Sequence, residues 1–172
     1  MLSAIVIAPS SPDPAAGRLQ EATVRSLAAL VGATIADIVR DACIVGAPGA
    51  GLSAIADHAG CGLVEDAELG RGLAAALKSA RSDRIFVLTA GYAPMSGFID
   101  EMSDWSLAAA PPAMALRAEP DSLARRIFPT LAPCVGVVAP RRDILEAAGD
   151  SAAVLARRLR ARTLTTRARR VV

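Results

Sequence analysis

Short apolar runs alternate with amphipathic segments along the first two thirds of the chain. Three of the four runs are followed within two residues by glycine or proline, and the runs lack polar alternation, which is typical of strands that are covered on both faces. They predict strands at 2–8, 42–45, 62–64 and 84–89. Apolar positions at helical spacing predict helices after these strands, at 18–31, 52–59, 69–80 and 97–108.

Each predicted strand is followed by a helix, and this order favours parallel pairing of the strands. We therefore expect a three-layer α/β/α fold with a mostly parallel, Rossmann-like sheet. In such sheets ligands bind at the carboxyl ends of the strands. The loops 9–16, 46–51 and 89–96 are thus expected to line one edge together.

The last third of the chain has a less regular pattern. Apolar runs predict strands at 113–117 and 135–138 and an edge strand at 163–166. Helical spacing predicts helices at 141–148 and 151–160. We find no internal repeat and no linker between this part and the rest, so we expect a single domain.

The composition is that of a globular protein with an aliphatic core. Of the 172 residues, 53% are hydrophobic, 21% are charged and only 3% are aromatic, which excludes a disordered chain. The 19 basic and 17 acidic residues give a net charge of +2, too balanced to indicate a nucleic-acid-binding protein. Arginines dominate 157–170, without aromatic residues between them for base stacking. This basic end is interpreted first as a solvated helix face, and it would also fit a weak contact with an anionic membrane surface.

Cysteine and histidine are too few and too scattered to indicate a zinc site. Cys43, Cys61 and Cys134 are widely spaced and His58 is the only histidine, so all four would have to converge. An odd number of cysteines without a disulfide framework indicates reduced thiols. The sequence has no apolar run long enough for a membrane span and no basic segment typical of a signal peptide. We therefore expect a cytoplasmic protein, peripheral to the inner membrane face at most.

Five segments match the motifs of one enzyme family in order. They are S-A-I-V-I-A-P-S-S at 3–11, C-I-V-G-A-P-G-A-G-L-S-A-I-A-D at 43–57, G-R-G-L-A-A-A at 70–76, F-V-L-T-A-G-Y at 86–92, and 135–148 with its paired arginines. Together they resemble the family 2 glycosyltransferases. Enzymes of that family have the GT-A fold and transfer a sugar from a nucleotide diphosphosugar to an acceptor.

The resemblance implies a nucleotide-sugar site and different roles for the two halves of the chain. Within one GT-A-like domain over 1–172, it implies a nucleotide-sugar half at 1–110 and an acceptor-side half with the basic end at 111–172. The implied nucleotide-sugar residues are Pro9, Ser10, Ala47, Gly49, Arg71, Thr89 and Gly91. The family uses an acid late in the chain as general base, and Asp150 is the candidate here.

The chain departs from the family where the family places its acids. The loop 46–51 has no charged residue, and Gly91 occupies the position of the metal-binding aspartate. We therefore predict no Mg²⁺ or Mn²⁺ cofactor, although the family uses one. A leaving diphosphate still needs positive charge in the transition state, which Arg71 or Lys78 could supply. Two hypotheses follow: sugar transfer that is weak or independent of metal, and a non-catalytic scaffold or binding protein on the same fold.

Other patterns allow alternative interpretations. The glycine loop 46–51, with Glu65 further along, partly matches a dinucleotide-binding motif, but its G-x-x-G-x-G order also fits a plain tight turn. Asp100 and Asp104 have the spacing to share a helix face and hold a metal, although acids are favoured near a helix N-terminus in any case. Trp105 is either a core residue or a platform for a sugar ring.

Overall fold

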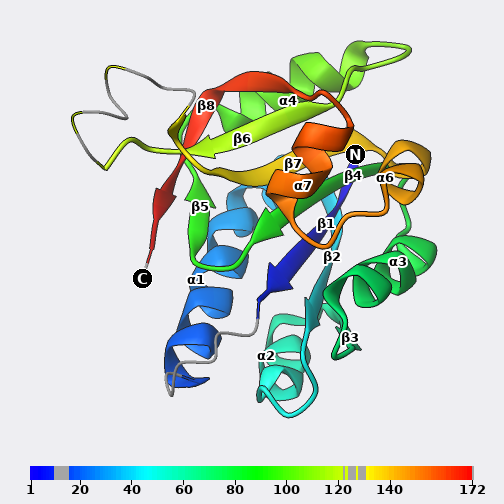
Figure 1. The fold of residues 1–172 in the computed structure, drawn as a ribbon, viewed down its shortest axis with the longest axis vertical. Helices are drawn as coiled ribbons and strands as arrows, with labels where there is room; N and C mark the ends of the chain where they lie inside the picture. Colours follow the sequence, from blue (N-terminus) through cyan, green and yellow to red (C-terminus); the bar gives the residue numbers. More distant parts are fainter. Residues whose placement is uncertain (10–15, 122, 124–126, 128–130, 172) are drawn as a thin grey trace.

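Strand β1 (Leu2–Ala8) lies inside the parallel part of the sheet and is buried along its whole length. It pairs in parallel with β2 (Val39–Gly46) on one side and β4 (Arg84–Thr89) on the other, and β3 (Gly62–Glu65) pairs in parallel outside β2. The structure is a computed structural model that describes residues 1–9, 16–121, 123, 127 and 131–171. Figure 1 gives the path of the chain.

Beyond β4 the sheet contains antiparallel pairs and one further parallel pair. Strand β7 (Cys134–Pro140) runs against β4 and against β6 (Met114–Ala118). Strand β8 (Arg162–Arg170) is parallel to β6, and the three-residue β5 (Tyr92–Pro94) runs against β8 at the end of the sheet. The order of the eight strands is β3-β2-β1-β4-β7-β6-β8-β5. The sheet is therefore mixed, with a parallel part built before Ala90 and an antiparallel part built mainly from the last third.

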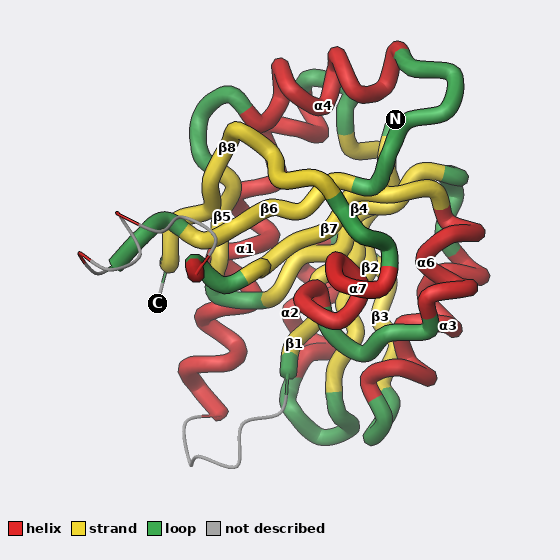
Figure 2. Tube along the Cα trace, turned by 45° about the horizontal axis from the view of Figure 1, so that its top comes forward, coloured by secondary structure: helices red, strands yellow, loops and turns green. Residues whose placement is uncertain are grey.

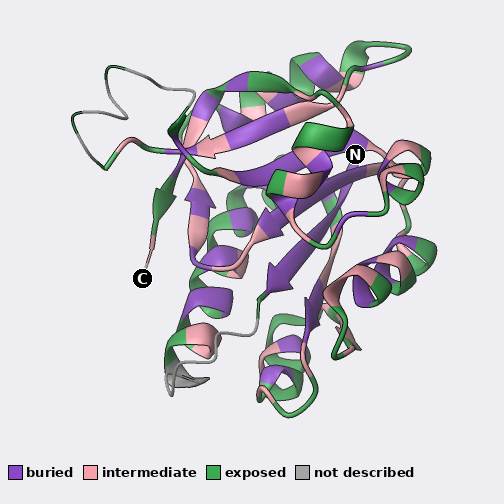
Figure 3. Cartoon of the chain, viewed as in Figure 1, coloured by how far each residue is buried: buried purple, intermediate pink, exposed green. Residues whose placement is uncertain are grey.

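Helices cover both faces, which completes the three predicted layers (Figure 2). One face carries α1 (Ala16–Ile35), α2 (Leu52–Ala59) and α4 (Phe98–Leu107). The other carries α3 (Leu69–Ser79), α6 (Arg141–Ala147) and α7 (Ala152–Arg158). The buried strands between them appear as the continuous interior of the molecule in Figure 3. Among the described helices, none is long and apolar enough to cross a membrane.

The core is aliphatic, as the composition predicts, and the buried aromatic residues among those described lie on one face of the sheet. Phe86 of β4 and Phe98 of α4 pack in a tilted arrangement with ring centroids 4.8 Å apart. Trp105 is 7% exposed, and its indole nitrogen donates a hydrogen bond to Pro112 O at 2.8 Å. The structure therefore places Trp105 in the core.

Strands 2–8 and 84–89 and helix 52–59 agree with the structure to the residue. The prediction of an edge strand at 163–166 is wrong: β8 is nine residues long and lies between β6 and β5. Residues 92–94, expected in a loop, form the edge strand β5. Both errors have one cause, since these segments have little apolar signal of their own and become strands by pairing with each other.

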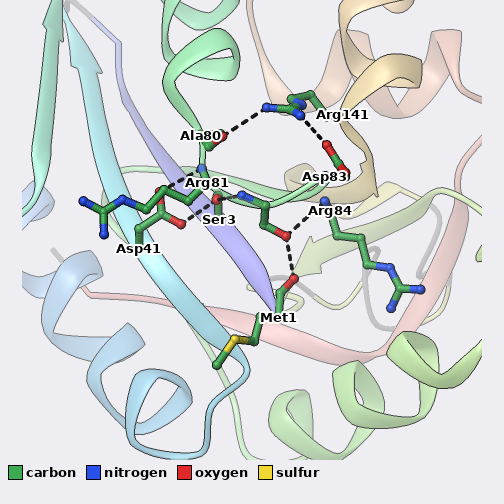
Figure 4. Close-up of polar contacts among 9 residues, drawn as sticks. Met1, Ser3, Asp41, Ala80, Arg81, Asp83, Arg84 and Arg141 are labelled. Carbon is green, nitrogen blue, oxygen red and sulfur yellow. Dashed lines mark hydrogen bonds and ion pairs between the residues drawn. The ribbon is translucent and has the colours of Figure 1, made fainter.

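A network of polar contacts connects the amino ends of the strands (Figure 4). The buried Ser3 hydroxyl donates to Asp41 Oδ1 at 2.5 Å and accepts the Ser82 N–H at 2.9 Å. Ser82 Oγ donates to Met1 O at 2.7 Å. Arg141, at the start of α6, donates to Ala80 O at 3.0 Å and pairs with Asp83. The loop between α3 and β4 is thereby joined to β1, β2 and α6.

The one sheet includes strands from both 1–110 and 111–172. The assignment of nucleotide-sugar and acceptor-side roles to these two halves stays a prediction.

Candidate functional site

The carboxyl ends of the parallel strands meet at one edge of the sheet, as predicted. Ala8 is in register with Gly46, Ile7 with Thr89, and Gly46 with Glu65. The chain leaves this edge through the loops that follow β1, β2, β3 and β4. Because β7 runs the opposite way beside β4, its start lies at this same edge.

A cavity of about 620 Å³ lies at this edge, on the face that carries α3, α6 and α7. Three parts of the chain form its walls: the residue after β1, the start of α3, and the turn from α6 into α7 with the outer side of α7. The lining residues are Pro9, Ala67, Glu68, Leu69, Gly70, Ala148, Gly149, Asp150, Val154, Arg157 and Arg158. The cavity therefore combines segments from both ends of the sequence.

The start of α3 is held by an exposed cluster of charges. Arg71 donates to both carboxylate oxygens of Asp66, at 2.7 and 2.8 Å, and lies 3.7 Å from Glu68 Oε2. The hydrogen bonds from Arg71, with one from the Glu68 N–H, lower the pKa of Asp66, and the same contacts raise the pKa of Arg71. Arg71, predicted to contact the diphosphate, thus has two carboxylate partners in the structure. One of them, Glu68, lines the cavity, whereas Arg71 itself does not.

Close packing brings α3 and the turn 148–150 against their neighbours. A Cβ at Gly72 would lie 2.8 Å from Val45 Cγ1 and 3.2 Å from Asp66 Cβ. A Cβ at Gly149 would lie 2.8 Å from Leu155 Cδ2. Glycine at these two positions lets α3 lie directly on β2 and lets the turn fold onto α7, which forms the walls of the cavity.

The arginines of α7 bring positive charge to the cavity. Arg158 Nη1 donates to Ala147 O at 2.6 Å and to Ala148 O at 2.8 Å, so its guanidinium is fixed at the C-terminal end of α6. Arg157 is exposed, and within the described part of the chain no side-chain hydrogen bond or ion pair holds it. Asp150 is exposed, and its Oδ1 accepts a hydrogen bond from Ser151 Oγ at 3.2 Å.

The structure brings Pro9 and Asp150 together in the cavity, whereas the predicted site residues Ala47, Gly49, Arg71, Thr89 and Gly91 do not line it. Thr89 pairs with Ile7 at the end of β4. Gly91 is buried below α1, where its N–H donates to Ser26 Oγ at 2.9 Å. Ala47 and Gly49 belong to the loop that leads to α2. Ser10 lies outside the described residues.

The described residues at this edge do not fit a divalent cation. Across 1–9, 16–121, 123, 127 and 131–171, no group of three or more His, Cys, Asp or Glu side chains is placed to hold a metal ion. Mg²⁺ and Mn²⁺ prefer carboxylate oxygens, whereas the carboxylates Glu68 and Asp150 line this cavity together with two arginines. At α4, Glu101 accepts the Thr165 and Thr166 N–H groups at 2.8 and 3.0 Å, so it has a structural role.

A larger cavity, of about 650 Å³, lies between α1 and α2. Its lining is almost entirely apolar, with Leu27, Val31 and Ile35 from α1 and Ile55 from α2. It lacks the charged groups that would orient a diphosphate. The smaller cavity at the carboxyl edge is therefore the candidate site.

Sequence reasoning did not assign Arg157 and Arg158 to the site, because seven arginines near the C-terminus were interpreted together as a solvated surface. The available signal was positional. These two residues follow the candidate base Asp150 by only two helical turns, so any fold that brings Asp150 to the edge also brings them close. Glu68 was missed in the same way, next to Arg71.

Comparison with known proteins identifies the fold. The sequence matches no family model and no curated protein. The structure is similar to that of HddC from Yersinia pseudotuberculosis in complex with GMP-PN, with a TM-score of 0.62, 11% identity, and coverage of 99% of this chain and 94% of HddC. A protein from Bacillus anthracis named as a glucose-1-phosphate thymidylyltransferase gives a TM-score of 0.58 at 12% identity, with 98% and 89% covered.

Glucosyl-3-phosphoglycerate synthase from Mycobacterium tuberculosis, in complex with Mn²⁺, UDP and phosphoglyceric acid, gives a TM-score of 0.51 at 15% identity. The match covers 83% of this chain but only 57% of the synthase, so this chain spans little more than half of it. The chain has a GT-A-like α/β/α fold. Identities this low establish the fold alone.

Proposed function

We propose that the chain binds a nucleoside diphosphate sugar in the cavity at the carboxyl edge, with arginine facing the diphosphate. One observation carries the proposal: Arg157 and Arg158 line the same cavity as Pro9 and the start of α3. That edge is where open α/β sheets bind nucleotides. Two proteins of similar fold were determined with a nucleotide, GMP-PN in HddC and UDP in the mycobacterial synthase, which supports this ligand class.

The residues of the cavity suit sugar transfer that is slow and independent of metal. A leaving nucleoside diphosphate gains negative charge in the transition state, and fixed positive groups stabilise it. The guanidinium of Arg158 is held in place by two carbonyl oxygens, and Arg157 is adjacent to it. The carboxylate of Asp150 lines the same cavity and is the candidate base for an acceptor hydroxyl.

The test is a titration with UDP, GDP and their sugars, with and without Mn²⁺, followed by thermal unfolding. A ligand at ten times its dissociation constant should stabilise the protein by about 1.4 kcal/mol. Arg157→Gln should weaken binding about tenfold or more, because it removes a charge-assisted contact to phosphate. The matched control Arg160→Gln removes the same charge just beyond α7, outside the cavity lining, and should bind as the wild type does.

Absence of any shift at millimolar nucleotide would remove the proposal, and equal binding by Arg157→Gln would remove Arg157 from it. Stabilisation that requires Mn²⁺ would contradict the proposal that arginine, and not a metal ion, faces the diphosphate. The second hypothesis, a non-catalytic scaffold or binding protein, is favoured by one observation: Gly91, at the position of the family's metal-binding acid, is buried below α1. A chain that binds no nucleotide would support this second hypothesis.

A further inference from the structure

Positive charge is concentrated at the end of the chain. Of the 19 basic and 17 acidic residues, seven arginines and no acid lie in 151–172, so this segment carries +7 and residues 1–150 carry −5. The arginines are Arg157, Arg158, Arg160, Arg162, Arg167, Arg169 and Arg170. Two of them line the cavity, and four lie on β8. Such a segregated charge attracts anions to this side of the molecule.

Two arginines from neighbouring strands share one face of the sheet. Along β8, Leu164 and Ala168 are buried in the core on the side of α1 and α4, so Arg167 points to the opposite face. Arg117 of β6 is in register with Arg167. Arg117 Nε donates to Thr163 Oγ1 at 3.4 Å, so it shares that face with the odd-numbered positions of β8.

Arg167 carries a buried donor for which the described residues offer no acceptor. Its Nη1 atom is buried, and no hydrogen-bond partner for it is found within 1–9, 16–121, 123, 127 and 131–171. A buried charged donor that lacks an acceptor destabilises the fold by more than a neutral one. Arg117, whose Nη1 donates to Ala132 O at 2.7 Å, adds a second positive charge on the adjacent strand. The two guanidinium groups bring positive charge to one face of β6 and β8, and an oxyanion bound there would supply the acceptor that Arg167 Nη1 lacks among the described residues.

We propose that Arg167 and Arg117 bind the phosphate group of a phosphorylated acceptor, an assignment that rests on the proposed function. Guanidinium groups match phosphate oxygens with paired hydrogen bonds. The position suits an acceptor because Arg117 is in register with Cys134, whose Sγ lies 3.7 Å from Ala152 O at the start of α7. Asp150 of the cavity lies two residues before the start of that helix, so an acceptor held by its phosphate can extend toward the cavity.

The first test is calorimetric titration of the full chain with inorganic phosphate at low ionic strength. The wild type should bind, and Arg167→Gln should bind at least about tenfold more weakly. The matched control is Arg169→Gln, an exposed arginine on the same strand and the same face, which should stay within about twofold of the wild type because it changes only the long-range field. No binding by the wild type, no loss in Arg167→Gln, or an equal loss in both variants would overturn the site.

A second pair of variants keeps the test decisive if Arg167→Gln does not fold. Arg167→Lys retains the charge without the planar fork and should also bind phosphate more weakly. Arg167→Met removes the unsatisfied donor and should raise the unfolding midpoint in phosphate-free buffer. A lower midpoint would mean that Arg167 is satisfied within the chain, which would overturn the site.

The phosphate could belong to a small molecule or to a lipid headgroup, and vesicles separate these sources. Binding to vesicles that contain phosphatidic acid, lost in Arg167→Gln, would support the site and identify a lipid. Binding of inorganic phosphate without vesicle binding would support the site and identify a small acceptor. The site and the proposed function can fail separately. If the chain binds UDP but no phosphate at Arg167, only the phosphate site is overturned. If it binds phosphate at Arg167 but no nucleotide, the nucleotide proposal and the acceptor role of the phosphate site are overturned.

Discussion

The two edges of the parallel sheet are built in opposite ways. At the amino edge, side chains connect separate elements, with the buried Ser3 hydroxyl between Asp41 and the Ser82 N–H, and Arg141 joining α6 to Ala80. At the carboxyl edge, contacts between the strand ends run through the backbone. The Ala90 N–H donates to Ile7 O at 2.8 Å, and the Asp66 N–H donates to Gly46 O at 2.9 Å.

This difference separates stability from binding. Side-chain hydrogen bonds that bridge distant segments hold the amino edge in one arrangement, so substitutions there should act on the folded state as a whole. Small residues leave the carboxyl edge open, and the charged groups there are exposed and able to face a ligand. Loops on a rigid scaffold commonly carry function for this reason. Substitutions at the amino edge should therefore reduce stability more than substitutions at the carboxyl edge, and the opposite order would contradict this separation.

The largest effect is expected at the amino edge. Ser3→Ala removes a hydroxyl that is 1% exposed and leaves the Ser82 N–H and Asp41 without their partner. We expect a loss of about 2 kcal/mol in the free energy of unfolding, measured by urea denaturation. Ser53→Ala, on the exposed side of α2, is the control and should change stability by less than about 0.5 kcal/mol. Equal losses in the two variants would contradict a structural role for the network.

A smaller effect is expected in the carboxyl-edge loop after β2. Gly49 has a φ of +76°, and a Cβ there would meet nothing within 4 Å. Gly49→Ala should therefore cost about 1 kcal/mol through backbone strain alone. Asn adopts the left-handed region more readily, so Gly49→Asn should recover part of that loss. If both variants matched the wild type in urea denaturation, this loop would not hold its left-handed turn in solution.

The smallest effect concerns the exposed pair at the start of α3. The Asp66 carboxylate, hydrogen-bonded by Arg71, should titrate below the ordinary range in an NMR pH titration. Because its folded-state pKa is lowered, the pair stabilises the fold at neutral pH, and this contribution is lost as the pH falls through that pKa. Arg71→Gln should return the midpoint of Asp66 toward its usual value, with Lys78→Gln on the same helix as the control. If the titration midpoint of Asp66 does not move in Arg71→Gln, Arg71 is not the residue that lowers the pKa of Asp66.

The candidate site was predicted only where its residues adjoin strong local signals. Pro9 follows the continuous apolar run of β1, so the sequence pattern places it at the edge, whereas Asp150 was a candidate only through the family resemblance. Arg157 and Arg158 occur in a basic segment whose pattern is equally compatible with a solvated face. Their place in the cavity depends on the packing of α7 against β7 and on Gly149, which are contacts between distant parts of the chain.

Elements with strong local preferences are readable from the amino-acid pattern: the buried strands β1 and β4, the helices with an apolar face, and hence the three-layer α/β/α architecture. The antiparallel pairings, the inner position of β8 and the pairing of β5 with it emerge only from the folded chain. An apolar run or a helical period stabilises its own segment, whereas an arginine-rich strand gains its stability from hydrogen bonds to partners far away in the sequence. The same long-range pairing sets Arg167 beside Arg117 and brings α7 to the cavity.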